Sequence, residues 1–304
     1  MARADYESMD TNPEIIIAGG GPAGLAAAIT LARSRRRVLV IDGGAPRNAP
    51  AHAVHALLGR EGISPAELLA TGREELRGYG GGVLTGEVTA VSLDGGRFGA
   101  TLADGTVLTA SRLVIATGLV DELPDVPGLR ERWGHTVLHC PYCHGWEVRD
   151  QQVAVLSTGP MSVHQALLFS QLSDSVRFLA HGTELAGEEA AKLAALGIDV
   201  VEGRVAGVEN DGVHLADGTV VPAQAVVVAP RMLARAEAFA GIGITTEENP
   251  MGRFIPVDAA GRTSVPGVWA AGNVTDPSAQ VGASAAAGTF VGAQLNAELV
   301  MERL

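Results

Sequence analysis

A glycine pattern near the start of the chain constrains the fold more than any other feature. Gly19, Gly21 and Gly24 form G-x-G-x-x-G directly after the apolar run EIIIA and before the helical pattern LAAAITLARS. The next apolar run, VLVID, ends at Asp42. Glycines at this spacing let the backbone approach a pyrophosphate at a helix N-terminus, and the acid accepts a ribose hydroxyl. The pattern predicts a βαβ dinucleotide-binding unit, and the alternative is a purely structural tight turn.

A second segment repeats this order of elements. VAVLS, TGPMSVHQALLFSQL and VRFLA follow one another from Val153 onward, as a strand, a turn with a helix, and a strand would. The repetition predicts an α/β fold with two Rossmann-like nucleotide-binding domains. The segments DELPDVPG and ENPMGRF favour crossings between the domains. We therefore expect a discontinuous first domain, residues 1–118 and 250–304, with the second domain, residues 119–249, inserted and carrying the cysteine pair.

Two later strand ends favour FAD over NAD as the ligand of the first domain. IATG and WAAGN both follow apolar runs and end in residues small enough for close approach to a cofactor. The helix expected over 281–299 can direct its positive end at a reduced isoalloxazine ring. Ordinary turns at strand ends are the alternative. The predicted FAD-binding residues are Gly19, Gly21, Pro22, Ala23, Gly24, Asp42, Gly43, Arg47, Asn48, Val88, Ala116, Thr117, Gly118, Gly272, Asn273, Gln280 and Val281.

The segment HCPYCH is the predicted chemical centre. Cys140 and Cys143 are the only cysteines of the chain, and a two-residue spacing lets them close a disulfide across one turn. Thiolate is the reactive form, and an adjacent histidine can lower a thiol pKa or accept the released proton. The pattern predicts a redox-active pair, with His144 as proton acceptor and His139 as a second candidate.

Three other interpretations of the cysteine pair remain open from the residues alone. C-x-x-C-H matches a c-type haem attachment site, which requires export of the chain. Four ligands from this one segment can surround zinc only in a strained tetrahedron, and the chain has no second C-x-x-C. An inert structural disulfide is the third. We expect the redox interpretation and no metal.

Charge and hydropathy exclude two classes of partner. The net charge of -12 opposes binding to a phosphate backbone, so we expect no nucleic acid. No apolar stretch approaches the length of a membrane span. The N-terminal MARADYESMDTNPE has neither the basic nor the apolar region of a secretory signal. We expect a cytoplasmic protein.

The landmarks also run in the order of a known family. GGGPAG, the acidic strand end, IATG before ELPDVPG, the C-x-x-C and WAAGN before a final helix make the chain resemble the low-molecular-weight thioredoxin reductases over essentially its whole length. CPYCHGWE resembles more specifically the branch of dithiol oxidases that close intramolecular disulfides in gliotoxin- and holomycin-type natural products. Reductases carry an acidic residue after the second cysteine, where this chain has His144.

This resemblance implies a mechanism and partners. It implies that Cys143 faces the flavin and Cys140 forms a mixed disulfide with a small-molecule dithiol substrate. It also implies a homodimer and places the loop that contains His52 and His55 near the flavin and the substrate opening. We expect molecular oxygen to accept the electrons, with hydrogen peroxide formed. The alternatives are an NADPH- or ferredoxin-dependent thioredoxin reductase and a non-catalytic redox sensor.

The second half departs from the reductases. Its glycine turn contains Ser157 and Ser162 where glycines are usual, and AHGTE, with Glu184, stands where reductases place an arginine pair for the NADPH 2′-phosphate. Asn273 also replaces the aspartate that usually ends the flavin strand. These departures disfavour NADPH binding.

Overall fold

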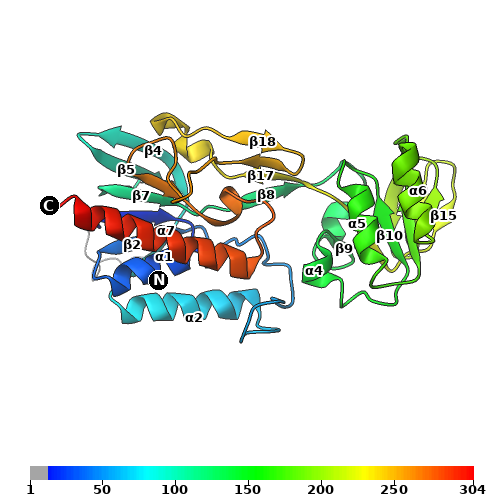
Figure 1. The fold of residues 1–304 in the computed structure, drawn as a ribbon, viewed down its shortest axis with the longest axis horizontal. Helices are drawn as coiled ribbons and strands as arrows, with labels where there is room; N and C mark the ends of the chain where they lie inside the picture. Colours follow the sequence, from blue (N-terminus) through cyan, green and yellow to red (C-terminus); the bar gives the residue numbers. More distant parts are fainter. Residues whose placement is uncertain (1–12) are drawn as a thin grey trace.

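Residues 13–304 of the chain are described from a computed structural model. The expectation that the chain has no secretory signal rests largely on residues 1–12, which lie outside the described residues. The chain forms two lobes side by side and crosses between them twice (Figure 1). The fold is mixed α/β with two Rossmann-type units, as predicted, and the second unit is inserted into the first.

A parallel five-stranded sheet forms the centre of the first lobe. Its strands, in spatial order, are β20 (Val268–Ala270), β7 (Arg112–Ile115), β1 (Ile15–Ala18), β2 (Val38–Asp42) and β3 (Gly82–Thr85). Ile15 and Ile17 pack into the core beneath the helices, whereas Ile16 packs into the core on the opposite face. Because both faces of the sheet are covered, β1 is apolar at every position.

Helices cover one face of this sheet, and a second sheet covers the other (Figure 1). The helices are α1 (Pro22–Arg33), α2 (Pro65–Gly78) and α7 (Val281–Met301), and the second sheet is β4 (Val88–Asp94), β5 (Arg97–Leu102) and β6 (Val107–Ala110). Small residues let α1 and α7 pack backbone to backbone. A Cβ atom on Gly288 would lie 2.0 Å from the carbonyl oxygen of Ala23. The predicted final helix therefore forms, and it extends two residues beyond 299.

A four-stranded sheet corrects the predicted domain limits. Its strands are β18 (Glu247–Asn249), β19 (Gly252–Phe254), β17 (Arg231–Ala234) and β8 (Leu119–Glu122). β17 pairs with β8, and the 3-10 helix η1 (Glu237–Ile242) contributes Phe239 to the first lobe's core. ENPMGRF forms the β18–β19 hairpin instead of a crossing. The limits at 118/119 and 249/250 therefore cut through the first lobe, and the chain crosses after β8 and before β17.

The second lobe has its own parallel sheet. Its strands, in spatial order, are β12 (Asp199–Val201), β11 (Val176–Leu179), β10 (Val153–Leu156), β16 (Ala225–Val227) and β9 (Val137–Leu138). Around it lie α3 (Leu129–Arg132), α4 (Pro141–His144), α5 (Ser162–Phe169), α6 (Gly187–Ala195) and an antiparallel sheet of β13 (Val205–Glu209), β14 (Gly212–Leu215) and β15 (Val220–Val221). Short α4, which carries the cysteines, lies on the side of this lobe that faces the first (Figure 1).

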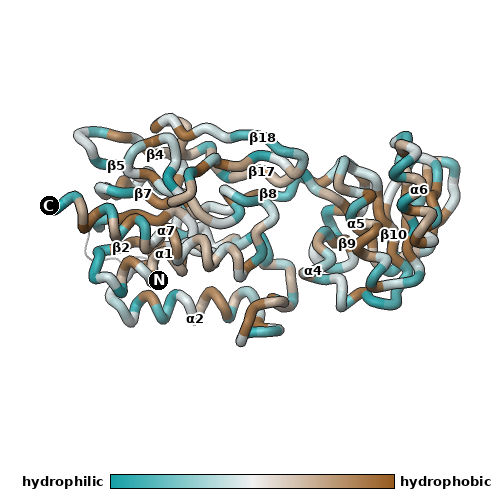
Figure 2. The backbone as a smooth tube through the Cα atoms, viewed as in Figure 1, coloured by the Kyte–Doolittle hydropathy of each residue, from teal (hydrophilic) through white to brown (hydrophobic). Residues whose placement is uncertain are grey.

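Apolar residues concentrate inside each lobe. The strongly apolar segments in Figure 2 follow the central strands, β10 among them, and the buried side chains form two separate cores in each lobe. Among residues 13–304, no helix is long and apolar enough to cross a bilayer.

Candidate active site

A cavity of about 880 Å³ opens where the two lobes meet. It is lined by both cysteines and by segments from the ends of β1, β2, β7 and β20. Since the carboxyl ends of parallel strands share one sheet edge, residues far apart in sequence converge there. The predicted residues that line it are Gly19, Gly21, Pro22, Ala23, Asp42, Gly43, Arg47, Asn48, Val88, Ala116, Thr117, Gly118, His139, Cys140, Cys143, His144, Asn273, Gln280 and Val281.

The glycine turn after β1 has the shape of a phosphate cradle. Gly19 has a φ of +110°, and a Cβ atom there would lie 2.2 Å from the carbonyl oxygen of Ala116. Gly21 has no atom within 4 Å of its missing Cβ and precedes α1, whose first turn has no acidic side chain. An open turn at a helix N-terminus suits an anion. The cavity residues thus fit a bound dinucleotide.

Two predicted cofactor residues do not line the cavity. A Cβ atom on Gly24 would lie 1.9 Å from the carbonyl oxygen of Gly19. Gly272 has a φ of +83°, and its Cβ would lie 2.7 Å from the Cβ of Ala23. Both glycines therefore act by letting backbone segments pack behind the cavity, so their effect on a ligand is indirect.

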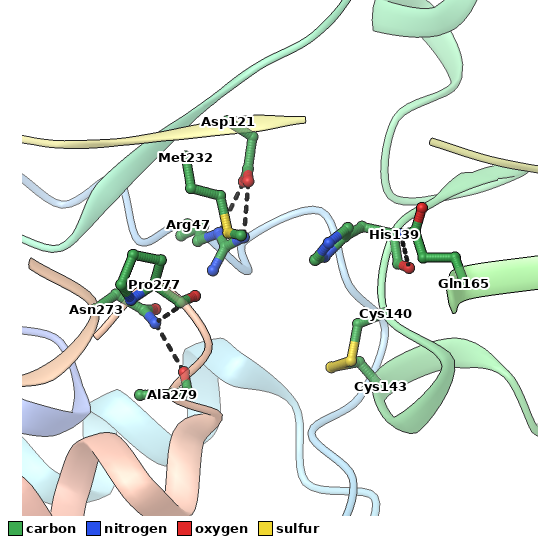
Figure 3. The surroundings of a disulfide bond; sticks show 10 residues. All are labelled: Arg47, Asp121, His139, Cys140, Cys143, Gln165, Met232, Asn273, Pro277 and Ala279. Carbon is green, nitrogen blue, oxygen red and sulfur yellow. Dashed lines mark hydrogen bonds and ion pairs between the residues drawn. A yellow bond between two sulfur atoms is a disulfide. The ribbon is translucent and has the colours of Figure 1, made fainter. Parts of the chain in front are cut away.

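Polar cofactor candidates already have protein partners. Asp42 accepts hydrogen bonds from Arg73 at 2.6 Å and from the amide of Gly44 at 3.1 Å. The Asn273 Nδ2 group donates to the carbonyl oxygens of Ala279 at 2.8 Å and Pro277 at 3.4 Å (Figure 3). The Asn273 amide thus fixes the loop that precedes α7, which adds a structural role to the ligand contact predicted for it.

The cysteines stand at the start of α4. Cys140 and Cys143 are joined in a disulfide, with Cα atoms 5.3 Å apart. Pro141 occupies the first helical turn, where its fixed φ suits the helix, and the amide of His144 donates to the carbonyl oxygen of Cys140 at 3.2 Å. A Cβ atom on Gly145 would lie 2.2 Å from the Pro141 carbonyl oxygen, so a small residue must follow the motif. This local structure presents the disulfide to the cavity.

His144 has the position and the electrostatics of a proton acceptor. Its Nε2 atom is buried and has no hydrogen-bond partner among the described residues. Burial lowers the pKa of His144; Glu147 acts in the opposite direction, and His55 and His52 lower the pKa further. The ring is therefore neutral near pH 7, with a nitrogen free to accept a proton in the cavity.

His139 is a weaker base than His144. Burial and the nearby Arg47 lower its pKa to about 4, although Asp121 acts in the opposite direction. Arg47 donates from Nε and from a terminal nitrogen to the Asp121 carboxylate, each at 2.7 Å (Figure 3). Gln165 donates to the His139 carbonyl oxygen at 2.9 Å. At neutral pH, His139 is uncharged and lines the cavity.

The depressed pKa of His139 predicts a pH dependence of stability. The unfolded chain binds a proton near pH 6.5 that the folded chain excludes until about pH 4, so the stability falls as the pH drops between these values. From pH 7 to pH 5 this contribution is about 2 kcal/mol. We expect His139→Gln to remove that slope in urea unfolding, whereas the exposed His164→Gln should keep it. An unchanged slope in His139→Gln would contradict the assignment.

The second glycine turn, after β10, is closed by its own side chain. The Ser162 Oγ atom accepts hydrogen bonds from the amides of Thr158 at 3.0 Å and Gly159 at 3.2 Å, and Ser162 is 1% exposed. In the first unit the equivalent turn is open. A phosphate at the second turn would have to compete with a buried hydroxyl for these amides. The Arg204 guanidinium lies beside Gly182 in AHGTE, with its Nε atom 3.6 Å from the position of a Cβ atom on that glycine.

Several cavity residues escaped sequence reasoning. Asp121, Trp133, Arg235 and Ser284 line the cavity, and Arg73 reaches Asp42 from α2. Each belongs to a segment without a nucleotide-binding motif, so the sequence holds no local signal for it. DELPDVPG, which includes Asp121, was expected only to be a crossing, and the helix that contains Ser284 was expected to act through its N-terminal end.

Comparisons with known proteins agree with this geometry. Residues 13–289 match the pyridine nucleotide-disulphide oxidoreductase family. A protein called thioredoxin reductase tcpT, from Claviceps purpurea (strain 20.1), is 32% identical over 277 residues, which are 86% of each chain. The crystal structure of HlmI superimposes with a TM-score of 0.90 at 46% identity, over 97% of this chain and 94% of that one. An oxidoreductase from Agrobacterium tumefaciens superimposes with a TM-score of 0.91 at 34% identity, over 95% and 99%.

A fold of two nucleotide-binding units with a disulfide at their junction defines a class of redox proteins. The chain belongs to the pyridine nucleotide-disulphide oxidoreductase family and, within it, to the thioredoxin reductase-like proteins. It is therefore an oxidoreductase. The residues of the active site bear on the direction of electron transfer, the substrate and the electron acceptor.

Proposed function

We propose that this protein is an FAD-dependent dithiol oxidase that closes an intramolecular disulfide in a small-molecule dithiol of natural-product type. The observation that carries the proposal is the contrast between the two nucleotide-binding turns. The first is open and shares one cavity with the Cys140–Cys143 disulfide, whereas Ser162 closes the second. Electrons can then enter from a dithiol through the cysteines more readily than from a nicotinamide.

The cysteines perform the thiol–disulfide chemistry. A substrate thiolate attacks Cys140, and Cys143 leaves as a thiolate. The second substrate thiol then attacks the sulfur that joined the substrate to Cys140, releasing a cyclic disulfide and leaving both cysteines reduced. His144 accepts a proton at Nε2 because that atom is neutral, buried and unpartnered. His139 shields this exchange from water.

The open turn fits FAD, which when bound would supply an acceptor for the electron pair of the reduced cysteines, with oxygen as the terminal acceptor. Gly19, Gly21 and the start of α1 would hold the pyrophosphate, Asp42 the ribose, and the segment before α7 the ring. The net reaction converts the dithiol and O₂ into the cyclic disulfide and H₂O₂, so atoms and electrons balance. A homodimer is part of the proposal, on the family resemblance alone.

A thioredoxin reductase is the second candidate function. The name of the tcpT relative favours it, as does that of a thioredoxin reductase from Streptomyces coelicolor (strain ATCC BAA-471 / A3(2) / M145) that is 29% identical over 304 residues. This function needs NADPH or another donor to reduce the flavin. The bond from Ser162 to the second turn opposes the NADPH version.

Oxygen uptake distinguishes the two candidates. With a reduced small dithiol as substrate, we expect continuous oxygen uptake and one H₂O₂ for each disulfide formed. NADPH should bleach the anaerobic flavin at least about 100-fold more slowly than the dithiol, because Ser162 occupies the amides of Thr158 and Gly159 and the second unit has no arginine pair. Rapid bleaching by NADPH together with reduction of thioredoxin would assign the chain to the reductases instead.

A further inference from the structure

The loop after β2 connects the first lobe to the cysteine turn. In Figure 1 the segment that follows β2 extends toward α4. A Cβ atom on Gly134 would lie 2.6 Å from the Cβ of Pro50, and the rings of His52 and His135 lie 5.8 Å apart. The loop therefore contacts the second lobe at residues 134–135, just before β9 and the cysteines.

A polar contact joins the same loop to the far end of the cysteine turn. His55 lies between two carboxylates: its Nδ1 atom is 2.6 Å from Glu61 Oε1, and its Nε2 atom is 3.5 Å from Glu147 Oε1. The contact with Glu61 is a hydrogen bond, whereas the longer contact with Glu147 is an ion pair when the ring is protonated. Glu61 belongs to the loop itself, whereas Glu147 belongs to the second lobe, three residues after His144.

The loop end of this contact is held in a fixed shape. Ala56 has a φ of +55°, which is unfavourable for a residue with a side chain, and its amide donates to Glu61 Oε2 at 2.9 Å. Val54 and Ile63 form a backbone bridge that closes the loop. Glu61 thus stabilises the strained backbone beside His55 and also orients the imidazole ring of His55. A side chain presented this way loses little freedom when it meets Glu147.

We propose that His55, Glu61 and Glu147 form an interlobe clasp that holds the cysteine turn over the open nucleotide site of the first lobe. The three residues are positioning residues, because they hold α4 in place, and Glu147 and His55 also act on the pKa of His144. This proposal depends on the proposed exchange of electrons between the cysteines and FAD. It does not depend on the identity of the substrate or on the direction of electron transfer.

The size of the effect follows from the exposure of the clasp. The side chains of His55, Glu61 and Glu147 are 24%, 66% and 44% exposed, so water screens their charges. Exposed pairs of this kind change an equilibrium by up to about fivefold. The clasp therefore shifts the equilibrium between two positions of the cysteine turn, one over the nucleotide site and one displaced from it. It does not determine the fold.

Hydrogen–deuterium exchange of the purified protein tests the clasp across the interface. We expect Glu147→Ala to raise exchange in loop residues 51–62 of the other lobe, and His55→Ala to raise it in residues 144–149. The matched control is Glu188→Ala, which removes an exposed carboxylate paired with Lys192 at 2.8 Å and should change neither segment. Exchange that rises only in each variant's own lobe would overturn the clasp.

The rate of dithiol-driven flavin bleaching provides the second readout. His55→Ala and Glu147→Ala should each slow dithiol-driven bleaching by up to about fivefold. The variant that carries both substitutions should be no slower than either single variant. Photoreduction of the flavin should be unaffected in all three. Additive losses in the double variant would overturn the clasp. If dithiol does not bleach the wild-type flavin at all, the proposed function fails, while the exchange measurement still decides whether the clasp exists.

Discussion

Cys143→Ser is expected to stop dithiol oxidation while leaving the protein yellow. Serine cannot form a disulfide or leave as a stabilised anion at neutral pH, so the cysteine couple no longer exists. We expect turnover to fall by at least about a thousandfold, because without Cys143 the substrate has no disulfide to attack at Cys140. Steady-state oxygen uptake with a reduced small dithiol measures the loss. The flavin content of the variant shows that the cofactor site is intact.

Tyr142→Phe is the matched control for this variant. It lies between the two cysteines, is 64% exposed, and loses only a hydroxyl. Its turnover should stay within a few-fold of the wild type. Full turnover by Cys143→Ser would mean that dithiols reach the flavin without the disulfide, and the proposed mechanism would be wrong.

Gly24→Ala is expected to produce the second-largest effect, on cofactor binding. The added methyl would lie 1.9 Å from the Gly19 carbonyl oxygen, which is backbone and cannot rotate away. The turn and α1 must separate, and the cradle loses its shape. We expect FAD affinity to fall on the order of 100-fold, since overpacking of this kind costs up to about 3 kcal/mol. Equilibrium titration of the apoprotein with FAD measures it.

Gly78→Ala separates this effect from a general loss of stability. Gly78 ends α2 and has no atom within 4 Å of its missing Cβ, so the same substitution should leave FAD binding unchanged. Circular dichroism and urea unfolding of both apoproteins show whether each variant folds. A folded Gly24→Ala protein that binds FAD like the wild type would contradict the role of this turn.

The sequence predicted best those features that local chemistry determines. Gly24 packs against Gly19 within one turn, and the turn lies between a strand and a helix that are adjacent in sequence, so the βαβ unit and its position were predicted correctly. The cysteine turn is equally local, because Pro141 and the spacing of the sulfurs define it. The insertion of the second unit was inferred from two proposed crossings, although the second of them, ENPMGRF, is a hairpin of the first lobe.

Features that depend on distant pairing were not predictable from local patterns. β17 joins the first lobe because Arg231 to Ala234 pair with β8 more than 100 residues earlier, which no local composition reveals. The serines of the second turn were visible, but not that Ser162 would bond to its amides. The contact between His55 and Glu147 likewise exists only because the loop and α4 meet in the folded chain.

An anaerobic titration of the oxidised holoenzyme with a reduced small dithiol tests the central claim most directly. Each dithiol delivers two electrons, and the proposed direction runs from the cysteines to the flavin, so the account predicts that the flavin of the wild type bleaches completely with at most two equivalents of dithiol per FAD. In Cys143→Ser the flavin should stay oxidised. No bleaching of the wild type, or bleaching of Cys143→Ser to the same extent, would show that the Cys140–Cys143 pair does not pass electrons to the cofactor.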